Sequence, residues 1–360
     1  MSRLVAVETA LPAHVHPQHE ITAGLGPLLA PSPARRELLD RLHAASGVRQ
    51  RHLVLPLPSY ADLTTFGAAN DHFLTLGTEL AAEAVTRALD AAGLAPTDID
   101  LLLVTSVTGV GAPSVDALLV GRLGLRTDVR RMPSFGLGCA GGAAGLARMH
   151  DYLVGHPGDV AVLVCLELCS LTLQAGDDST ASLVSSAIFG DGAAAAVLVG
   201  ADRPASDRRS ARRLPDVVDS ASRLLPGTSG HLGWRIGGSG FRIVLAPGVP
   251  RVIEEHLGAE VDGLLAQHGL SVADVGAWVV HAGGPKVLDA VEAALGLPPV
   301  ALSASRTSLA EVGNLSSASV LHVLHVLTAR GDPPPGSVGV LVAFGPGISC
   351  DLVLLRWPED

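Results

Sequence analysis

Apolar residues recur every three or four positions in two long segments of the chain, and each segment leads into an apolar strand. One face of the first segment carries Leu80, Ala84, Val85, Ala88 and Leu89, and one face of the second carries Ile253, Leu257, Val261, Leu264 and Leu265. This spacing predicts two amphipathic helices. Residues 101–105 and 277–281 follow them and are largely apolar, as in strands that a parallel sheet buries on both faces.

The two segments belong to an internal repeat. AGLAPTDIDLLLV at residues 92–104 matches HGLSVADVGAWVV at residues 268–280, and Gly269 lies 176 positions after Gly93. The match suggests that each half of the chain repeats one supersecondary unit.

The repeat continues towards the carboxyl terminus at a nearly constant offset. GLGCAGGAAGLARM at 136–149 stands opposite EVGNLSSASVLHVL at 311–324, and GDVAVLVC at 158–165 stands opposite GSVGVLVA at 336–343. These landmarks indicate an ancient duplication, and they predict an α/β fold of two similar halves, each a sheet covered by helices.

The join between the halves is expected in the stretch 200–225, which is rich in Arg, Asp, Ser and Pro. Such a composition is typical of a solvated connector, and a collar for an anionic substrate handle is the alternative. We therefore expect one half at residues 1–205 and the other at 206–360. The first half begins with a strand over residues 1–11.

Charge and composition exclude several classes of protein. The 360 residues carry 25 Lys plus Arg against 35 Asp plus Glu, a net charge of −10 that disfavours a nucleic-acid partner. A hydrophobic content of 48% argues against disorder. The longest apolar runs, such as 193–199, fall short of the roughly 18 residues that suggest a membrane span, so no membrane insertion is expected.

Cysteine usage favours a reducing compartment. The four cysteines, Cys139, Cys165, Cys169 and Cys350, form neither a disulfide framework nor a zinc-binding spacing, so a cytoplasmic location and no metal are expected. A group of His14, His16 and His19 with Glu20 is interpreted as an exposed turn.

Cys139 is the strongest candidate for chemistry from local sequence. It lies among glycines and alanines just before a helical pattern at 143–153. A helix amino terminus favours a thiolate and can bind an oxyanion, and small neighbours let a substrate carbonyl approach the backbone. The alternative is a buried structural cysteine.

The repeat places two further polar residues opposite landmarks of the first half. Asn314 corresponds to Cys139, and His281 corresponds to Thr105 at the end of the repeated strand. Packing of the halves about a pseudo-twofold axis would bring Cys139, His281 and Asn314 together. Taken singly, His281 could be a satisfied core histidine and Asn314 a helix cap.

Five motifs then give a specific resemblance. These are GLGCAGG around Cys139, FGDGA at 189–193, HAGGP at 281–285, GNLSS at 313–317 and FGPG at 344–347. In order and spacing the sequence resembles the type III polyketide synthases, the chalcone-synthase-like branch of the thiolase superfamily. The resemblance implies a thiolase-like αβαβα layered fold of two duplicated halves.

The resemblance also implies roles for individual residues. Cys139 matches the nucleophile that holds the growing chain, and His281 and Asn314 match the pair that stabilises the oxyanion or enolate. The positions that match substrate contacts are Phe189 and Phe241 (gatekeeping aromatics), Glu167, Cys169, Thr172, Ala112, Ser316, Gly345 and Gly347. The positions that match CoA contacts are Arg41, Gly283, Gly284 and Lys286.

Three departures from the family pattern stand out. Leu38 and Ala45 occupy positions where the family has lysines that contact CoA phosphates, and Ala343 replaces a glycine before FGPG. Lys286 could compensate for the missing lysines. Ala112 lies in a loop that reaches the partner subunit's cavity in the family, where plant members have methionine, so a roomier pocket is expected.

The implied reaction uses CoA thioesters as substrates and needs no cofactor. An acyl-CoA starter loads onto Cys139, malonyl-CoA extends it by decarboxylative condensation, and the chain cyclises to a pyrone or resorcinol-type product. A thiolate–imidazolium pair would keep the nucleophile ionised. A homodimer is expected, and small or apolar Val107, Ala112, Cys169 and Leu171 favour an aliphatic starter.

Four alternatives remain. A β-ketoacyl-acyl-carrier-protein synthase III also uses Cys, His and Asn, but its histidine motif usually reads HQAN. A thiolase would need a second catalytic cysteine, for which Cys350 is the candidate, although it lies in a strand-like run. A cysteine-dependent acyl-CoA hydrolase would release free acid without chain growth. A non-catalytic scaffold would not need Cys139 at all.

Overall fold

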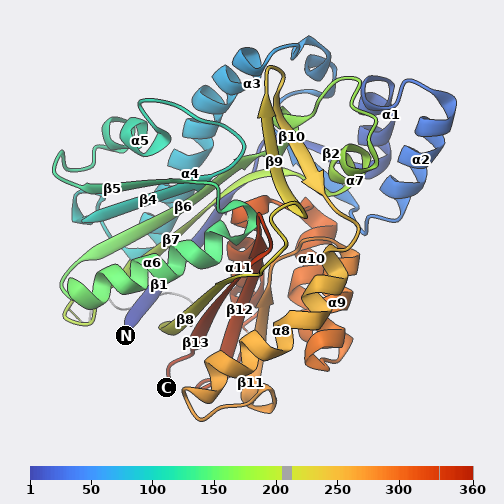
Figure 1. The fold of residues 1–360 in the computed structure, drawn as a ribbon. Coiled ribbons are helices and arrows are strands. Elements are labelled where there is room, and N and C mark those ends of the chain that lie inside the picture. The colour runs from blue at the N-terminus through green and yellow to red at the C-terminus, as the bar shows by residue number, and fades with distance from the viewer. Residues whose placement is uncertain (205–212, 332, 360) are drawn as a thin grey trace.

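A nine-stranded mixed sheet forms the centre of the protein in this computed structural model, which describes residues 1–204, 213–331 and 333–359 (Figure 1). Its strand order is β11-β12-β13-β8-β1-β7-β6-β4-β5. The strands of the main sheet are β1 (Ser2–Ala10), β4 (Leu101–Ser106), β5 (Arg130–Phe135), β6 (Val160–Leu168), β7 (Asp191–Val199), β8 (Asp216–Leu224), β11 (Val275–Val280), β12 (Val338–Gly345) and β13 (Ser349–Arg356). Two small sheets stand apart, β2 (His14–Pro17) with β3 (Gln50–Leu53) and β9 (Leu232–Gly237) with β10 (Gly240–Leu245).

Helices cover the sheet and fill the space between its halves. They are α1 (Gln18–Leu29), α2 (Pro33–Ala44), α3 (Phe66–His72), α4 (Thr78–Ala92), α5 (Val115–Leu123), α6 (Gly141–Gly155), α7 (Thr180–Ile188), α8 (Val249–Ala266), α9 (Pro285–Leu295), α10 (Ser303–Val312) and α11 (Ser319–Ala329). Short single turns include η3 (Pro96–Asp98), η4 (Gly138–Ala140), η5 (Cys169–Thr172), η6 (Val272–Asp274) and η8 (Ser316–Ala318). Within the described residues, no helix is both long and apolar enough to cross a membrane.

The two halves repeat the same topology, as the sequence predicted. In the first half β4 pairs with β6 in parallel, and β6, β7 and β1 follow in antiparallel order. In the second half β11, β12, β13 and β8 are paired in the same way. Gly93 and Gly269 end equivalent helices with the same φ of +67°. That left-handed conformation explains the glycine at both positions.

Strands β1 and β8 join the halves through a short seam. Only Ser2 with Val217 and Arg3 with Asp216 are paired there, and Arg3 donates two hydrogen bonds to the Asp216 carboxylate at 2.7 and 2.8 Å. The expected division between residues 205 and 206 lies outside the described residues.

The layers follow the predicted αβαβα order. Helices α6 and α11 lie between the two halves, because each contacts strands of both. Helix α4 covers the outer face of the first half, and α8 packs with α9 on the outer face of the second. The apolar helix faces predicted from the sequence are buried, including Leu80, Val85, Ile253 and Leu257. Burial of these faces provides the main favourable free energy of folding.

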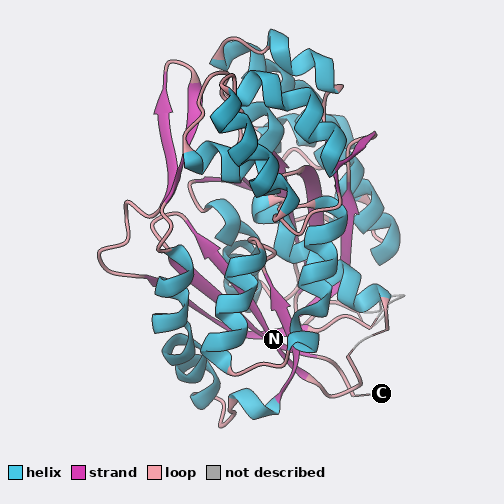
Figure 2. Cartoon of the chain, turned by 90° about the vertical axis from the view of Figure 1, so that its right-hand side faces the viewer, coloured by secondary structure: helices cyan, strands magenta, loops and turns pink. Residues whose placement is uncertain are grey.

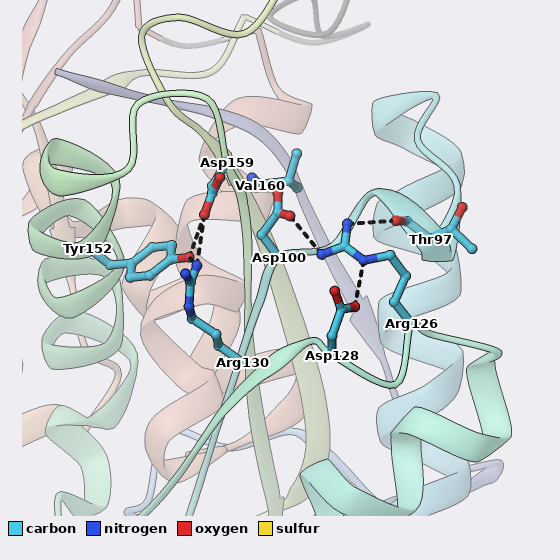
Figure 3. Close-up of polar contacts among 8 residues, drawn as sticks. All are labelled: Thr97, Asp100, Arg126, Asp128, Arg130, Tyr152, Asp159 and Val160. Atoms are coloured by element: carbon cyan, nitrogen blue, oxygen red, sulfur yellow. Dashed lines mark hydrogen bonds and ion pairs between the residues drawn. The ribbon is translucent and has the colours of Figure 1, made fainter.

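A network of ion pairs fixes the loops at the end of the sheet away from Cys139 (Figure 3). Asp100 precedes β4 and accepts hydrogen bonds from Arg126 at 2.9 Å and from the Val160 amide at 2.8 Å. Nearby, Arg130 contacts both Tyr152 and Asp159. The network ties the starts of β4, β5 and β6 together and leaves their other ends for the site described next.

The hairpin of β9 and β10 stands outside the main sheet (Figures 1 and 2). Its register pairs Trp234 with Ile243 and Ile236 with Phe241. Opposite residues in an antiparallel pair share a face, so these four apolar side chains lie on one side of the hairpin. Arg235 and Arg242 lie on the other side.

Candidate active site

Cys139 lies in the single turn η4, between the end of β5 and the start of α6. The preceding Gly138 has φ of +52°, and a Cβ there would lie 2.5 Å from the Pro346 ring. Gly345 approaches the same turn, because a Cβ there would lie 2.5 Å from the Leu137 carbonyl oxygen. The FGPG loop of the second half therefore packs directly on the turn that carries the thiol, and glycine is required at both positions.

The GNLSS loop of the second half reaches the thiol from another direction. The Cys139 thiol donates a hydrogen bond to Ser316 Oγ at 3.6 Å. Ser316 has φ of +48°, an uncommon conformation for a residue with a side chain. Its amide donates to Asn314 Oδ1 at 2.8 Å. This bond occupies the amide oxygen of Asn314, so the NH2 group is the part of that side chain that can donate to a substrate.

His281 follows β11 directly and is 2% exposed. Its amide donates to the Val342 carbonyl on β12 at 2.8 Å, which fixes the backbone at the strand end. The ring lies against Gly283, where a Cβ would come within 3.2 Å of His281 Cδ2. His281 Nδ1 is buried and has no hydrogen-bond partner in the described part of the chain. A buried nitrogen without a partner is costly, and this one is free to bind a ligand or a proton.

Burial opposes charge on both the thiol and the imidazole. It raises the pKa of Cys139 to about 12, an effect that the hydrogen bond to Ser316 partly offsets. It lowers the pKa of His281 to about 4. Burial alone therefore favours the neutral thiol and the neutral imidazole, and the expected thiolate–imidazolium pair stays a prediction.

Glu167 forms the polar centre behind Cys139. One carboxylate oxygen accepts from Ser317 Oγ at 2.6 Å and from Ser316 Oγ at 3.3 Å. The other accepts from Thr108 Oγ1 at 2.9 Å and from the Val107 amide at 3.1 Å. Burial nevertheless raises the pKa of Glu167 to about 7. The carboxylate links loops from both halves and contacts the serine that holds the thiol.

A small cavity of about 20 Å³ opens beside Cys139. Its lining comprises Val107, Gly138, Cys139, Cys169, Phe189, Leu232, Gly233, Trp234, Ile243, Ser316 and Pro346. The expected positions Val107, Cys169, Phe189 and Ser316 are thus brought together around the thiol. This volume holds about one water molecule, so the closed site has no room for an acyl chain.

Trp234 is a cavity residue that the sequence patterns did not single out. Its ring is 6.1 Å from that of Phe241, which in turn stacks edge-on against Phe66 at 5.3 Å and lies 6.1 Å from Phe135. Phe241 is buried in this aromatic cluster rather than in the lining of the cavity. Only 3% of the chain is aromatic, so four such rings at one place are a concentrated feature. The alternation of apolar residues in the hairpin was the available signal.

The remaining expected substrate contacts lie around this core. Leu171 and Thr172 are buried in η5, and the Thr172 hydroxyl donates to the Cys169 carbonyl at 2.7 Å. Gly347 has φ of +68°, and its amide donates to the Leu232 carbonyl at 2.8 Å, which attaches the hairpin to the FGPG loop. Ala112 is exposed in the loop between β4 and α5, away from the cavity of its own chain.

The two cationic residues among the expected CoA contacts lie on the surface at neighbouring elements, whereas Gly284 is buried. Arg41 is exposed on α2, and Lys286 is exposed in the first turn of α9. The loop after α2 touches the start of α9, because a Cβ on Gly47 would lie 3.2 Å from Pro285 Cγ. Gly284 caps α9 with φ of +136°. The two cationic side chains therefore come from adjacent segments.

A larger groove of about 500 Å³ lies between α1 and α2. Its lining includes Arg36, Arg49 and Asp40, so charges of both signs face it. Its lining includes neither Cys139 nor His281 nor Asn314.

No metal site and no second catalytic cysteine are formed by the described residues. They contain no group of three or more metal-ligating side chains, and His16 instead contacts Glu20 at 3.2 Å. Cys350 is buried in β13 opposite Phe344 and is absent from the lining of the cavity, so the thiolase alternative receives no support.

Comparison with known proteins gives a consistent result over nearly the whole chain. Residues 1–203 match the family model "Chalcone and stilbene synthases, N-terminal domain", and residues 216–357 match the corresponding C-terminal domain. A 1,3,6,8-tetrahydroxynaphthalene synthase of Streptomyces peucetius subsp. caesius is 55% identical over 354 residues, which cover 98% of this chain and 93% of that protein.

Solved structures also resemble the protein over nearly its whole length. A 1,3,6,8-tetrahydroxynaphthalene synthase from Streptomyces coelicolor A3(2), described as a bacterial type III polyketide synthase, aligns with a TM-score of 0.92 at 33% identity. The alignment covers 99% of this chain and all of that chain. PKS-I from the brown alga Ectocarpus siliculosus aligns with a TM-score of 0.91 at 28% identity, covering 99% of this chain and 98% of that chain.

Proposed function

The chain belongs to the chalcone and stilbene synthase family of type III polyketide synthases, and on that premise we propose that it makes 1,3,6,8-tetrahydroxynaphthalene from malonyl-CoA alone. The relative at 55% identity carries this name, and so do two further relatives. Each ring of that naphthalene has the resorcinol pattern of hydroxyl groups. The ten ring carbons correspond to five two-carbon units, so malonyl-CoA can serve as starter and extender.

The single observation that carries the proposal is the junction of the two halves around one thiol. We assign Cys139 in residues 1–205 as the nucleophile and His281 and Asn314 in residues 206–360 as the groups that support it. The Cys139–Ser316–Asn314 contacts support this assignment. The neutral imidazole of His281 is able to take the thiol proton as the sulfur attacks a CoA thioester and the CoA thiolate leaves.

Extension then needs stabilisation of an enolate. When malonyl-CoA loses carbon dioxide, the electron pair of the broken C–C bond passes to the thioester oxygen. We assign the donors of this oxygen to the Asn314 NH2 group and the His281 ring, and the burial of both residues supports this, because hydrogen bonds are strong in a water-poor site. The enolate carbon attacks the acyl thioester on Cys139 and releases the sulfur.

We assign the CoA handle to Arg41 and Lys286, with Gly283 and Gly284 forming the adjacent backbone. Both side chains are exposed, cationic and on neighbouring segments, which suits the phosphates of CoA. The substrates place the enzyme in the cytoplasm, and all four cysteines are free thiols.

We propose that the enzyme is a homodimer built on the β5 side of the sheet. Strand β5 is the outer strand of the first half, and its Met132 is 41% exposed and its Phe135 49% exposed. Val110 and Leu118 are exposed apolar residues on the neighbouring loop and helix. An open edge strand beside exposed apolar groups favours pairing with a second copy. Light scattering should give twice the chain mass of 36.7 kDa, whereas a monomer would contradict the proposal.

The decisive experiment incubates the purified protein with malonyl-CoA as the sole substrate. Mass spectrometry should detect tetrahydroxynaphthalene or its oxidised quinone, and Cys139→Ala should abolish it. A pyrone as the main product would overturn the naphthalene assignment but retain the family chemistry. Free malonate without carbon dioxide release would instead support the hydrolase alternative.

A further inference from the structure

Arg51 is a buried cation that the reaction described above does not use. It lies on β3, outside the main sheet, and is only 3% exposed. Burying an arginine is costly unless its donors are satisfied. In Arg51, Nη1 and Nε have partners, whereas the buried Nη2 has none among the described residues. Its hydrogen-bond partners therefore indicate what the protein gains from it.

The guanidinium of Arg51 binds the backbone of Phe189. Its Nη1 donates to the Phe189 carbonyl oxygen at 2.7 Å, and its Nε donates to Gln18 Oε1 at 3.1 Å. Gln18 is itself anchored, because its Nε2 donates to the Ala187 carbonyl at 2.8 Å. Both bonds direct the fork of Arg51 at residues 187–189, the segment that carries the gatekeeping aromatic.

The same peptide group that accepts from Arg51 also holds Asn314. The carbonyl of Phe189 and the amide of Gly190 belong to one planar peptide unit, so fixing one end fixes the other. The Gly190 amide donates to the Asn314 carbonyl at 3.0 Å, and the Asn314 amide donates to the Ile188 carbonyl at 2.8 Å. A continuous chain of bonds thus runs from Arg51 through this peptide unit to Asn314.

Arg51 also packs against the residue before Asn314. Gly313 has φ of +76°, and a Cβ there would lie 3.1 Å from Arg51 Cγ and 2.7 Å from the Ile188 carbonyl oxygen. The methylene groups of Arg51 and the carbonyl of Ile188 therefore enclose Gly313 from two sides. Arg51 limits the movement of the loop both through its charge and through its stem.

We infer that Arg51 is a positioning residue that sets the backbone of Asn314 and so aims its NH2 group at the enolate oxygen. It does not touch substrate, and it acts through the Phe189–Gly190 peptide unit. The inference rests on the assigned role of Asn314 in decarboxylation but not on the identity of the final product.

The chemistry of arginine explains the choice of residue. A lysine has one point charge and cannot donate to Gln18 and to Phe189 with the geometry of the fork. A methionine fills the space of the stem but leaves the Phe189 carbonyl without its buried donor. The negative charge of Asp191 favours the protonated form, and the pKa of Arg51, lowered by burial to about 10, keeps the side chain charged at neutral pH.

The test compares Arg51→Lys and Arg51→Met with the matched control Arg49→Met, two positions away. Arg49 is exposed and its nearest charge partner is Glu311 at 3.4 Å. The readout is carbon dioxide release from malonyl-CoA. We expect both Arg51 variants to lose about tenfold or more in kcat with KM changed less than about twofold, since removing a preorganised donor of an oxyanion costs about 100- to 1,000-fold. The control should match the wild type.

Two further measurements separate positioning from general damage. Alkylation of Cys139 by iodoacetamide should stay within about twofold of wild type in Arg51→Lys, because the Ser316 hydroxyl that accepts from the thiol is itself anchored on Glu167 at 3.3 Å, outside this chain of bonds. In an Asn314→Ala background, Arg51→Lys should have no additional effect on carbon dioxide release, since residues that act as a unit are not additive.

Three outcomes would overturn the inference. A folded Arg51→Lys with wild-type carbon dioxide release would show that the bond to Phe189 is not needed. Equal losses of alkylation and decarboxylation would indicate a structural role only, and so would losses that add fully to those of Asn314→Ala. If the wild-type enzyme itself released no carbon dioxide from malonyl-CoA, the proposed function would fail instead.

Discussion

The Cys139 thiol donates a hydrogen bond to the hydroxyl of Ser316, although 177 residues separate the two in sequence. One residue comes from each half of the repeat, at the amino ends of the equivalent helices α6 and α11. The Cys139 thiol is thus held by the half that carries His281 and Asn314, and this pairing leads to several predictions.

The first prediction concerns the ionisation of Cys139. Because burial raises its pKa to about 12, the thiolate fraction of the free enzyme should rise about tenfold per pH unit. The rate of iodoacetamide inactivation should therefore climb steadily between pH 7 and pH 9. Ser316→Ala should lower the rate at each pH, since the Ser316 hydroxyl lowers the pKa of Cys139 by donating to the sulfur once the thiol is ionised. A plateau near pH 7 that His281→Ala removes would restore the ion-pair interpretation.

A second prediction concerns the pH dependence of stability. Burial raises the pKa of Glu167 from 4.5 to about 7 and that of Asp191 from 3.8 to about 6, so the folded protein holds protons that the unfolded chain has lost. Stability contributed by these groups is present below the unfolded values and is lost as the pH rises through the folded ones. Their contribution to the unfolding free energy from urea titrations should therefore fall between pH 4.5 and pH 7. The buried His43, His281 and His322, whose pKa values burial lowers, contribute the opposite trend.

Glu167→Gln provides the comparison for that measurement. The amide cannot titrate, so the stability of the variant relative to the wild type should rise between pH 4.5 and pH 7. The amide also places an NH2 group among donors, so the variant should be less stable by about 1–3 kcal/mol at every pH. An unchanged pH slope would show that Glu167 does not carry a raised pKa.

The third prediction concerns the size of the cavity. Trp234→Ala removes the largest side chain of the lining, so longer aliphatic CoA starters should gain relative to malonyl-CoA, by about tenfold in kcat/KM for a pocket contact of this kind. Ile236→Ala is the matched control, because Ile236 lies on the same strand but is 61% exposed. Competition between starters, followed by mass spectrometry, measures the change. Equal product patterns in both variants would exclude Trp234 as a determinant.

The fourth prediction uses the fact that Lys286 is the only lysine in the sequence. Lys286→Ala should raise KM for malonyl-CoA about threefold to tenfold with little change in kcat, as expected when an exposed charge pair with phosphate is lost. Arg330→Ala controls for loss of a surface cation. An amine-directed reagent should label only Lys286 and the amino terminus, and CoA should protect Lys286. If CoA does not slow the labelling of Lys286, this lysine does not contact the CoA phosphates.

Sequence patterns predicted the features of the fold that recur in both halves of the repeat. The constant offset predicted which residues stand opposite Cys139 and Thr105, and the helical spacing predicted the buried faces of α4 and α8. The hairpin contacts of Trp234 could not be read in this way, because the hairpin pairs only with itself and meets the site through tertiary packing. Nor could the protonation states of Cys139 and His281, since these depend on burial rather than on residue type.

The contact of Arg51 with Phe189 illustrates the same limit. The two residues are 138 positions apart, and no local pattern links a residue of a small peripheral sheet to the turn after α7. Only the folded arrangement shows that they share a bond.

The short β1–β8 seam has a consequence for how such an enzyme changes over generations. In the proposed reaction centre, one half supplies the sulfur and the other supplies the imidazole and the carboxamide. A mutation in either half can therefore abolish the activity of the whole enzyme. A chain that lost one half could not be rescued by the other. The duplication that began as redundancy has become mutual dependence.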